Sequence, residues 1–307
     1  MERQLAIDRR VNLHKLEVLC LVVELGGVGR AAEALFVAQP VVTAHIRSLE
    51  ERVGTKLFYR EGRQLHLTES GRVVHTWAED VLARTRELDR HLAGLSDGSR
   101  GSVALGASMS LGSYRLPPVL TQFRRTHPAV ELRLSISDTE HTIEDARAGA
   151  FDFAVVVSDT DPEGPGLETE LLGHEELVLI MAPDAEPRAA EIAPSQLAEL
   201  PFIEAPEGIV RRRFVDRRLN ALGVSERNVV LELGHPEAMK RGVRAGLGVS
   251  MLFRSAVAEE LEMGMLREVR ITGSDVRIPV YLVHRKGKEF SPPHHELIDA
   301  VRAAFAG

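Results

Sequence analysis

The side chains best suited to a chemical role stand at helical spacing in the segment that begins at Gln39. Gln39, Thr43 and Arg47 recur every four residues, so a helix would place them along one face. An amide, a hydroxyl and a guanidinium can form hydrogen bonds with base edges and phosphates, and the small Ala44 allows close approach. Pro40 suits the first turn of a helix, where the N–H that proline lacks has no partner. The pattern is typical of a helix that enters a major groove.

The remaining residues of this segment predict a small helical core that would position the polar face. Apolar residues follow at steps of four, three and four and predict one buried stripe: Val42, Ile46, Leu49 and Val53. A preceding helix is expected to begin after Gly27, and residues 36–38 would form the turn between the two helices. An earlier helix over residues 13–25 would bury its own stripe: Leu16, Leu19, Cys20 and Val23.

A short hairpin is predicted after the helices, with its turn at Glu61 and Gly62. Leu65 and Leu67 alternate with polar neighbours, which is typical of a strand with one covered side. Arg60 and Arg63 would lie on this hairpin, where they could reach the DNA backbone or the minor groove. The hairpin would therefore act as a wing beside the helices.

Residues 13–71 resemble the winged helix-turn-helix of the LysR-type transcriptional regulators. The motifs that carry the resemblance follow in order: Gly29, Arg30-Ala31-Ala32-Glu33-Ala34-Leu35, Gln39-Pro40, Thr43, Ser48-Leu49-Glu50, Leu57-Phe58, Arg60 and Leu67-Thr68-Glu69-Ser70-Gly71. The chain departs from the usual pattern at Ala38 and Gly27, where the family usually has Ser, and at Ala44, where it often has a basic residue. These departures concern the DNA sequence that is read rather than the fold.

The resemblance implies a sequence-specific DNA-binding regulator whose second domain senses a small molecule, in an assembly of paired dimers. By this likeness, Gln39, Pro40 and Thr43 stand where the family reads its operator. The residues expected to contact double-stranded operator DNA are Arg30, Gln39, Pro40, Thr43, Ala44, Arg47, Arg60 and Arg63.

Composition agrees with this expectation. The 307 residues, of which 44% are hydrophobic and 27% charged, are enough for two or three globular units. Residues 1–67 carry a net charge of about +2 and the rest about −9, so only the first part is not acidic. The single cysteine, Cys20, excludes an internal disulfide and is expected to be an inert core thiol. Because no signal peptide and no apolar run of membrane-spanning length are found, we expect a cytoplasmic protein that does not contact membranes.

A long helix is predicted from Thr68 to about Leu95, since this stretch lacks proline and keeps one apolar face. That face consists of Val74, Trp77, Val81, Leu88, Leu92 and Leu95. We expect it to pair with the same helix of a second copy, because paired DNA half-sites require two heads at a fixed separation. The alternative is that the face packs on its own domain. Residues 96–101 are small and polar and predict a domain boundary.

From Ser102 onward, short apolar strands alternate with amphipathic helices, which predicts an α/β fold. The layout resembles the effector domain of the family, with two Rossmann-like lobes of the periplasmic-binding-protein kind. The predicted domains are a winged helix-turn-helix at residues 1–67, a linker helix and hinge at 68–100, and an effector domain at 101–307. Lobe I would comprise about 101–180 and 274–307, and lobe II about 181–273.

A ligand site is predicted where strands end and helices begin, because open α/β sheets bind ligands at these points. The candidate effector-binding residues are Ser108, Ser110, Ser137, Thr139, Glu204, Gly208 and Ile209. The alternative is ordinary helix capping by Ser and Thr. Hydroxyl donors and helix N-termini favour a small organic anion, although Glu204 would repel one unless Arg211 or Arg212 lies close.

Other motifs carry no catalytic chemistry. Gly246-Leu247-Gly248 is interpreted as a tight turn, His294 and His295 as solvated histidines, and residues 211–213 as a solvated face or as ion-pair or effector contacts. No nucleophile elbow, catalytic carboxylate pair, metal site or cofactor fingerprint is found, so we expect no enzyme. The rival interpretation is a two-lobed ligand-binding protein or enzyme whose head contacts another protein.

Overall fold

The computed structural model describes residues 11–62, 64–96, 101–274 and 276–306. The chain divides into two compact units, one comprising Met1–Ala93 with Arg147–Ala150 and the other Gly94–Ala146 with Phe151–Gly307. Each unit has its own hydrophobic core. Among the described residues, no helix combines the length and the apolarity needed to span a bilayer.

The first unit begins with three helices, α1 (Leu13–Glu24), α2 (Val28–Ala34) and α3 (Gln39–Val53). Asn12 caps α1 by accepting a hydrogen bond from the N–H of Lys15, and Gly27 is the N-cap of α2. The core between the helices contains Leu16, Leu19, Val22, Ala31, Ala32, Val42, Ile46 and Leu49. The small alanines of α2 allow the close helix packing that the sequence predicts.

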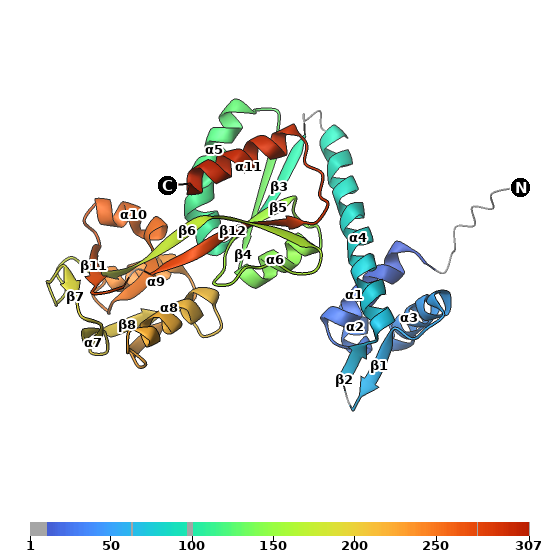
Figure 1. The fold of residues 1–307 in the computed structure, drawn as a ribbon, viewed down its shortest axis with the longest axis horizontal. Helices are drawn as coiled ribbons and strands as arrows, with labels where there is room; N and C mark the ends of the chain where they lie inside the picture. The colour runs from blue at the N-terminus through green and yellow to red at the C-terminus, as the bar shows by residue number, and fades with distance from the viewer. Residues whose placement is uncertain (1–10, 63, 97–100, 275, 307) are drawn as a thin grey trace, which may run out of the picture. The chain divides into compact units, whose positions relative to one another are not determined.

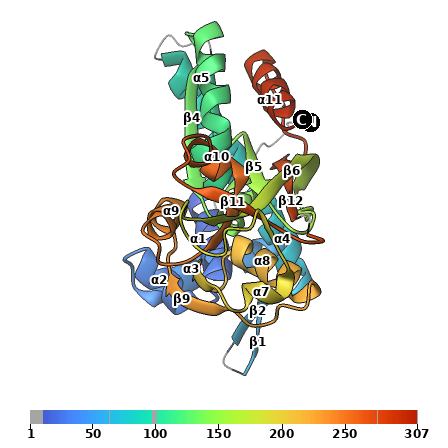
Figure 2. The same ribbon diagram turned by 90° about the vertical axis from the view of Figure 1, so that its left-hand side faces the viewer.

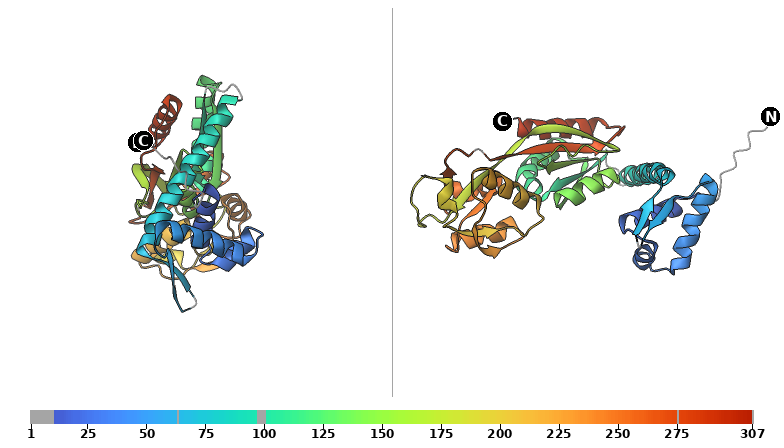
Figure 3. Two further views of the ribbon diagram at one scale, coloured as in Figure 1. Left: turned by 90° about the vertical axis from the view of Figure 1, so that its right-hand side faces the viewer. Right: turned by 60° about the horizontal axis from the view of Figure 1, so that its bottom comes forward.

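The wing and the long helix complete this unit (Figures 1 and 3). Strands β1 (Phe58–Glu61) and β2 (Gln64–Leu67) pair antiparallel, with Arg60 opposite Leu65. Helix α4 (Glu69–Ser96) follows directly, and the Thr68 hydroxyl accepts a hydrogen bond from the N–H of Gly71. Ala78 and Leu82 of α4 pack into the core of the head.

In the second unit, lobe I is built on the strands β3 (Ser102–Ser108), β4 (Glu131–Ser137), β5 (Phe153–Val157) and β12 (Arg277–Arg285). Strand β3 lies between β4 and β5 and is parallel to both, whereas β12 is antiparallel to β5. Helices α5 (Leu116–Thr126) and α11 (Pro292–Phe305) cover one face of this sheet and α6 (Thr139–Arg147) covers the other (Figure 1). The turn η1 (Leu111–Arg115), which is π-helical, runs into α5.

Lobe II shares the long strand β6 (Leu167–Met181) with lobe I. This strand pairs with β12 over residues 167–176 and with β10 (Ser250–Phe253) and β11 (Arg267–Ile271) beyond them. The two-residue strand β7 (Glu191–Ile192) completes the sheet, and β8 (Pro201–Glu204) pairs with β9 (Asn228–Glu232) in a parallel sheet of their own. The helices of this lobe are α7 (Pro194–Leu197), α8 (Val210–Ala221), α9 (Pro236–Arg244) and α10 (Arg254–Glu262) (Figure 2).

The α/β pattern predicted from the sequence is confirmed, including the start of α11 after Ser291. Five elements have no counterpart in the prediction: η1, β7, α7, α10 and β11. Strand β11 reads Arg267-Glu268-Val269-Arg270-Ile271, and its charged residues hide the apolar alternation. When the charged side chains of a strand form ion pairs with neighbouring elements, the sequence of the strand alone does not show the alternation that predicts it.

Candidate functional site

The predicted DNA-reading face lies on α3 and is open to solvent. Gln39, Thr43 and Arg47 are exposed, whereas Val42 lies in the core. The Thr43 hydroxyl donates to the main-chain oxygen of Gln39 at 3.0 Å, which leaves its methyl group and its lone pairs available. Arg47 pairs with Glu51 at 3.1 Å. This ion pair is exposed and therefore weak, so Arg47 can exchange it for a phosphate at little cost.

The other predicted DNA contacts surround this helix. Pro40 and Ala44 are exposed on α3, and Arg60 is exposed on the wing. Arg30, at the start of α2, donates to the main-chain oxygen of Gly26 at 3.0 Å. Arg63 lies outside the described residues. Val53 was expected in the buried stripe of α3, but it is exposed because it is the last residue of the helix, beyond the crossing with α1 and α2.

A cavity of about 90 Å³ opens between the two lobes of the second unit. Lobe I contributes Ser108, Met109, Ser110, Asp138, Thr139 and Val157, and lobe II contributes Ile209, Val210, Arg211, Gly234, Pro236 and Phe253. Four of the seven residues predicted to bind an effector therefore lie on one cavity: Ser108, Ser110, Thr139 and Ile209.

The hydroxyl groups of the cavity differ in how far the protein already satisfies them. Ser108 accepts a hydrogen bond from the N–H of Val157 at 3.2 Å, and Thr139 donates to the oxygen of the same residue at 3.1 Å. These two bonds hold the end of β5 against β3 and α6. Ser110 is mostly buried, and its side chain makes no capping bond to η1. Ser110 is thus the hydroxyl best placed to bond a ligand.

Three predicted residues do not line this cavity. Ser137 points its hydroxyl to Thr142, with an oxygen-to-oxygen distance of 2.8 Å, and so supports α6 from within lobe I. Gly208 precedes the start of α8, and its main-chain oxygen accepts from Arg213 at 3.0 Å. Glu204 is fully buried under α8, with Arg227 at 3.1 Å. Burial raises the pKa of Glu204, and Arg227 partly opposes that rise.

Arg211 is the cation of the cavity. Only 7% of it is exposed, and its guanidinium donates to the main-chain oxygen of Met251 at 2.7 Å and to the sulfur of Met239 at 3.1 Å. No carboxylate among the described residues forms an ion pair with it. Burial lowers its pKa to about 10, so it remains charged at neutral pH. Of the solvated face considered for residues 211–213, only Arg213 is exposed, because Arg211 is buried and Arg212 pairs with Asp216 at 3.0 Å.

Four helices direct their N-termini at the same cavity. Ser110 is the N-cap of η1, α6 begins at Thr139, Ile209 is the N-cap of α8, and α9 begins at Pro236. Each N-terminus carries a partial positive charge from its unpaired N–H groups. Arg211 and these helix ends make the cavity electropositive. Asp138 is the one lining carboxylate, and bonds from the N–H and ring of His141, at 3.0 and 2.6 Å, engage it.

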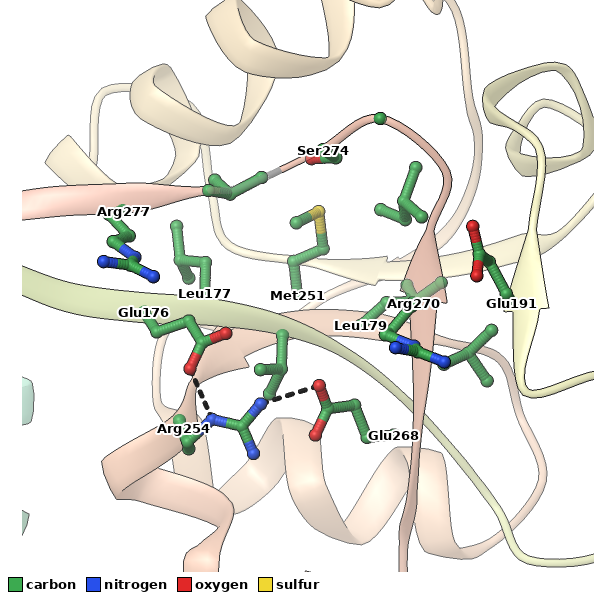
Figure 4. Close-up of a pocket in the computed structure, with 15 residues that line it drawn as sticks. Glu176, Leu177, Leu179, Glu191, Met251, Arg254, Glu268, Arg270, Ser274 and Arg277 are labelled. Atoms are coloured by element: carbon green, nitrogen blue, oxygen red, sulfur yellow. Dashed lines mark hydrogen bonds and ion pairs between the residues drawn. The ribbon is translucent and has the colours of Figure 1, made fainter.

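A second cavity, of about 400 Å³, lies beside β6 and β11 in lobe II (Figure 4). It is lined by acidic and basic side chains over a floor that includes Leu179 and Met251. Arg254 spans two carboxylates, Glu176 at 2.5 Å and Glu268 at 2.7 Å. Because these charges neutralise one another within the wall, this cavity lacks the net positive charge of the first.

His294 is not a solvated histidine. It lies in the first turn of α11, where Nε2 is 3.2 Å from Asp152 and Nδ1 is 2.7 Å from the hydroxyl of Ser291. Asp152 is buried and also pairs with Lys288 at 2.9 Å. His295 is exposed, as expected. No group of three or more His, Cys, Asp or Glu side chains among the described residues is arranged to hold a metal ion.

Comparison with known proteins identifies the family of both domains. Residues 13–72 match the model of the bacterial regulatory helix-turn-helix protein, lysR family, and residues 96–306 match that of the LysR substrate binding domain. A probable RuBisCO transcriptional regulator of Thalassiosira pseudonana is 34% identical, with 85% of this chain and 87% of that protein covered. Full-length OxyR from Pseudomonas aeruginosa, solved as a variant, has a TM-score of 0.61 at 23% identity and covers 96% of this chain and 97% of its own.

The regulatory domain of CcmR from Synechocystis, solved in complex with 2-PG, has a TM-score of 0.59 at 24% identity. It covers 67% of this chain and 98% of its own. The two family models together span the head and the two-lobed domain. The match decides against the rival interpretation of the head as a module for contacts with other proteins. The chain belongs to the LysR family of DNA-binding transcriptional regulators with an effector-binding domain.

Proposed function

We propose that a small organic anion in the cavity between the lobes controls how this regulator binds its operator. The observation that carries the proposal is Arg211, a buried cation on a wall of that cavity. Among the described residues no carboxylate forms a close ion pair with it, and the buried Glu204 acts on its charge only from farther away. A buried charge without a counter-ion is costly to the folded protein. An anionic ligand would supply that counter-ion.

The rest of the cavity fits the same ligand. The Ser110 hydroxyl and the N-termini of η1, α8 and α9 would donate hydrogen bonds to carboxylate or phosphate oxygens. The volume of about 90 Å³ favours a ligand of few heavy atoms. The 2-PG bound by the CcmR domain makes this compound the first candidate to test.

The DNA side of the function rests on α3 and the wing. We propose that Gln39, Pro40, Thr43 and Ala44 face base edges, and that Arg30, Arg47, Arg60 and Arg63 face the backbone. The domains would be residues 1–67 for the head, 68–100 for the linker helix and 101–307 for the effector domain. We also propose that the protein works in the cytoplasm, the compartment that holds bacterial DNA, and that it carries out no catalysis.

The anion proposal is tested by a ligand panel in which each anion has an uncharged counterpart. Small carboxylates and phosphate esters, with 2-PG among them, are compared with the corresponding amides and alcohols in thermal unfolding of the full chain. A ligand at a hundred times its Kd should stabilise the folded state by about 2.7 kcal/mol. We expect the unfolding temperature to rise with the anions and not with their uncharged counterparts. Equal rises with the neutral compounds would contradict the proposal.

Variants of the cavity residues test whether the anion binds between the lobes. Arg211→Met should abolish the shift, while Arg211→Lys keeps the charge and should retain part of it. Ser110→Ala should weaken it, because one hydrogen bond to a charged ligand is lost. The control is Arg188→Met, since Arg188 is exposed and pairs with Glu186 on the surface. The anion that binds should also change the footprint of the wild-type protein on its operator, which links the cavity to DNA binding.

A further inference from the structure

Phe36 has a backbone conformation that phenylalanine rarely adopts. It follows α2, and its φ of +56° lies in the left-handed region. Among the described residues, it is the only one other than glycine with a positive φ. The N–H of Phe36 donates to Glu33 at 3.1 Å and that of Val37 to Ala32 at 3.0 Å, the two bonds of a Schellman motif. Glycine or asparagine is the usual residue at this position.

The end of α1 provides a comparison within the same head. There the N–H of Gly26 donates to Val23 at 3.1 Å and that of Gly27 to Val22 at 3.0 Å, which is the same pair of bonds. Gly26 has a φ of +65° and carries no Cβ to clash with the backbone. At the end of α2, the chain closes the same motif with an aromatic residue. The side chain of Phe36 therefore adds strain that a glycine would avoid.

Packing does not offset this strain, because 96% of Phe36 is exposed. Val37 and Val41 beside it are also exposed, so three apolar side chains surround the N-terminal end of α3. Gln39, the first residue of that helix, belongs to the DNA-reading face. A strained and unpacked aromatic residue lowers the stability of the free protein. A residue of this kind points to a partner that covers it.

DNA is the partner that this position favours. In a helix-turn-helix, the N-terminal residues of the second helix contact the base edges of the major groove. The major groove carries one apolar group, the 5-methyl of thymine, and phenylalanine is among the side chains that contact it. We propose that Phe36 packs on a thymine methyl group of the operator and so contributes to sequence recognition. This inference rests on the proposed DNA-reading face of α3.

The test compares thymine with uracil, which differ by that methyl group alone. A duplex is selected by the wild-type protein from a random double-stranded library and is then resynthesised with deoxyuridine in place of every thymidine. We expect the wild-type protein to bind the thymine duplex about fourfold more tightly for each methyl group that Phe36 covers, the ratio that burial of one such group gives. Fluorescence anisotropy at one fixed salt concentration measures both affinities.

Phe36→Asn removes the aromatic ring and relieves the strain, because asparagine tolerates the left-handed region. We expect this variant to lose about fourfold of the preference for the thymine duplex for each methyl group that Phe36 covers. Any preference that remains would come from Thr43 or Ala44, whose side chains can also contact thymine methyl groups. The variant should unfold at a temperature no lower than the wild type. Phe36→Gly should behave in the same way. The control is Val53→Asn at the opposite end of α3, which should keep the full preference for thymine.

Each contrary outcome has a distinct meaning. If the wild-type protein selects a consensus but binds its thymine and uracil forms equally, the role of Phe36 is overturned. The proposed DNA-reading face of α3 is then unaffected. A Phe36→Asn variant that keeps the wild-type preference also overturns it, and its exposed ring would then fit a protein partner instead. A wild-type protein that selects no consensus overturns both proposals together.

Discussion

The Tyr114 hydroxyl donates a hydrogen bond to Glu237 at 2.6 Å and so joins η1 of lobe I to α9 of lobe II. The cavity between the lobes is lined by Ser110, which precedes η1, and by Pro236 at the start of α9. Lys240 strengthens the contact, because its Nζ lies 2.7 Å from Glu237 and 5.2 Å from the centre of the Tyr114 ring. The contact therefore links the two lobes.

The first prediction concerns this contact. Tyr114→Phe keeps the ring over Lys240 but removes the hydrogen bond, which should cost about 1 kcal/mol in the free energy of unfolding. It should also weaken anion binding, because the lobes lose a bond that holds them closed. Urea unfolding and ligand titration measure the two effects. Tyr59→Phe in the wing is the control, and an unchanged ligand affinity in Tyr114→Phe would contradict a role in closure.

The contact also predicts a pH dependence. Burial and the bond to Glu237 raise the pKa of Tyr114, so its hydroxyl stays protonated at neutral pH. Burial acts to raise the pKa of Glu237, but the bonds from Lys240 and Tyr114 outweigh it and lower the pKa. The contribution of Glu237 to stability is therefore present above its unfolded pKa of about 4.3 and is lost as pH falls through the folded value. In Tyr114→Phe, the free energy of unfolding should therefore fall less steeply as the pH is lowered than in the wild type. Urea unfolding at a series of acidic pH values measures this slope.

The third prediction concerns the buried Asp152. Burial acts to raise its pKa, but His294, Lys288 and the N–H of Ala104 outweigh this effect and hold the pKa well below its usual range. Asp152→Asn removes the buried carboxylate charge that Lys288 and His294 engage and should cost about 3 to 5 kcal/mol in the free energy of unfolding. Urea unfolding at pH 7 measures the loss. The exposed Asp184→Asn should change stability little, and a similar result for Asp152→Asn would show that the pair contributes nothing.

The fourth prediction separates DNA binding from effector binding. The double variant Thr43→Ala and Arg47→Ala should lower affinity for the selected duplex at least tenfold, because each removes a polar group from the reading face. Anion binding and oligomer size should stay unchanged, since both residues lie on the surface of the head. Mobility-shift titration measures the loss. If six or more phosphates are neutralised, affinity should also fall about a thousandfold between 50 and 200 mM salt.

The fifth prediction concerns the oligomer. On α4, Val73, Trp77, Leu88 and Leu92 are exposed, whereas Val74 and Val81 pack against the core of the head. The alternative that the face packs on its own domain therefore holds for Val74 and Val81, and we propose that the exposed residues pair with a second copy. Trp77→Glu with Leu88→Glu should halve the mass measured by sedimentation. Met263→Glu, at another exposed apolar residue, is the control, and an unchanged mass in the double variant would contradict pairing through α4.

The sequence by itself determined the head, the class of protein and the alternation of strands and helices. These depend on periodicity and on short motifs, which reflect contacts between near neighbours in the chain. The steps that place Val42, Ile46 and Leu49 on one side of α3 also leave Gln39 and Thr43 outward. The positions of Ser108 and Ser110 at a strand end also predicted that they would line a cavity, because the carboxyl ends of parallel strands meet at one edge of the sheet.

Only the tertiary structure decided which candidates face the cavity. Ser108 and Arg211 come from different lobes, and their approach depends on the pairing of β6 with strands of both lobes. The same packing buries Glu204 beneath α8, so that Glu204 does not line the cavity between the lobes. It also buries Arg211 in the wall of the cavity and leaves Phe36 exposed. The burial of a side chain and the pairing of its charge depend on contacts with segments far apart in the sequence. The pattern of residues along one helix or turn therefore does not predict them.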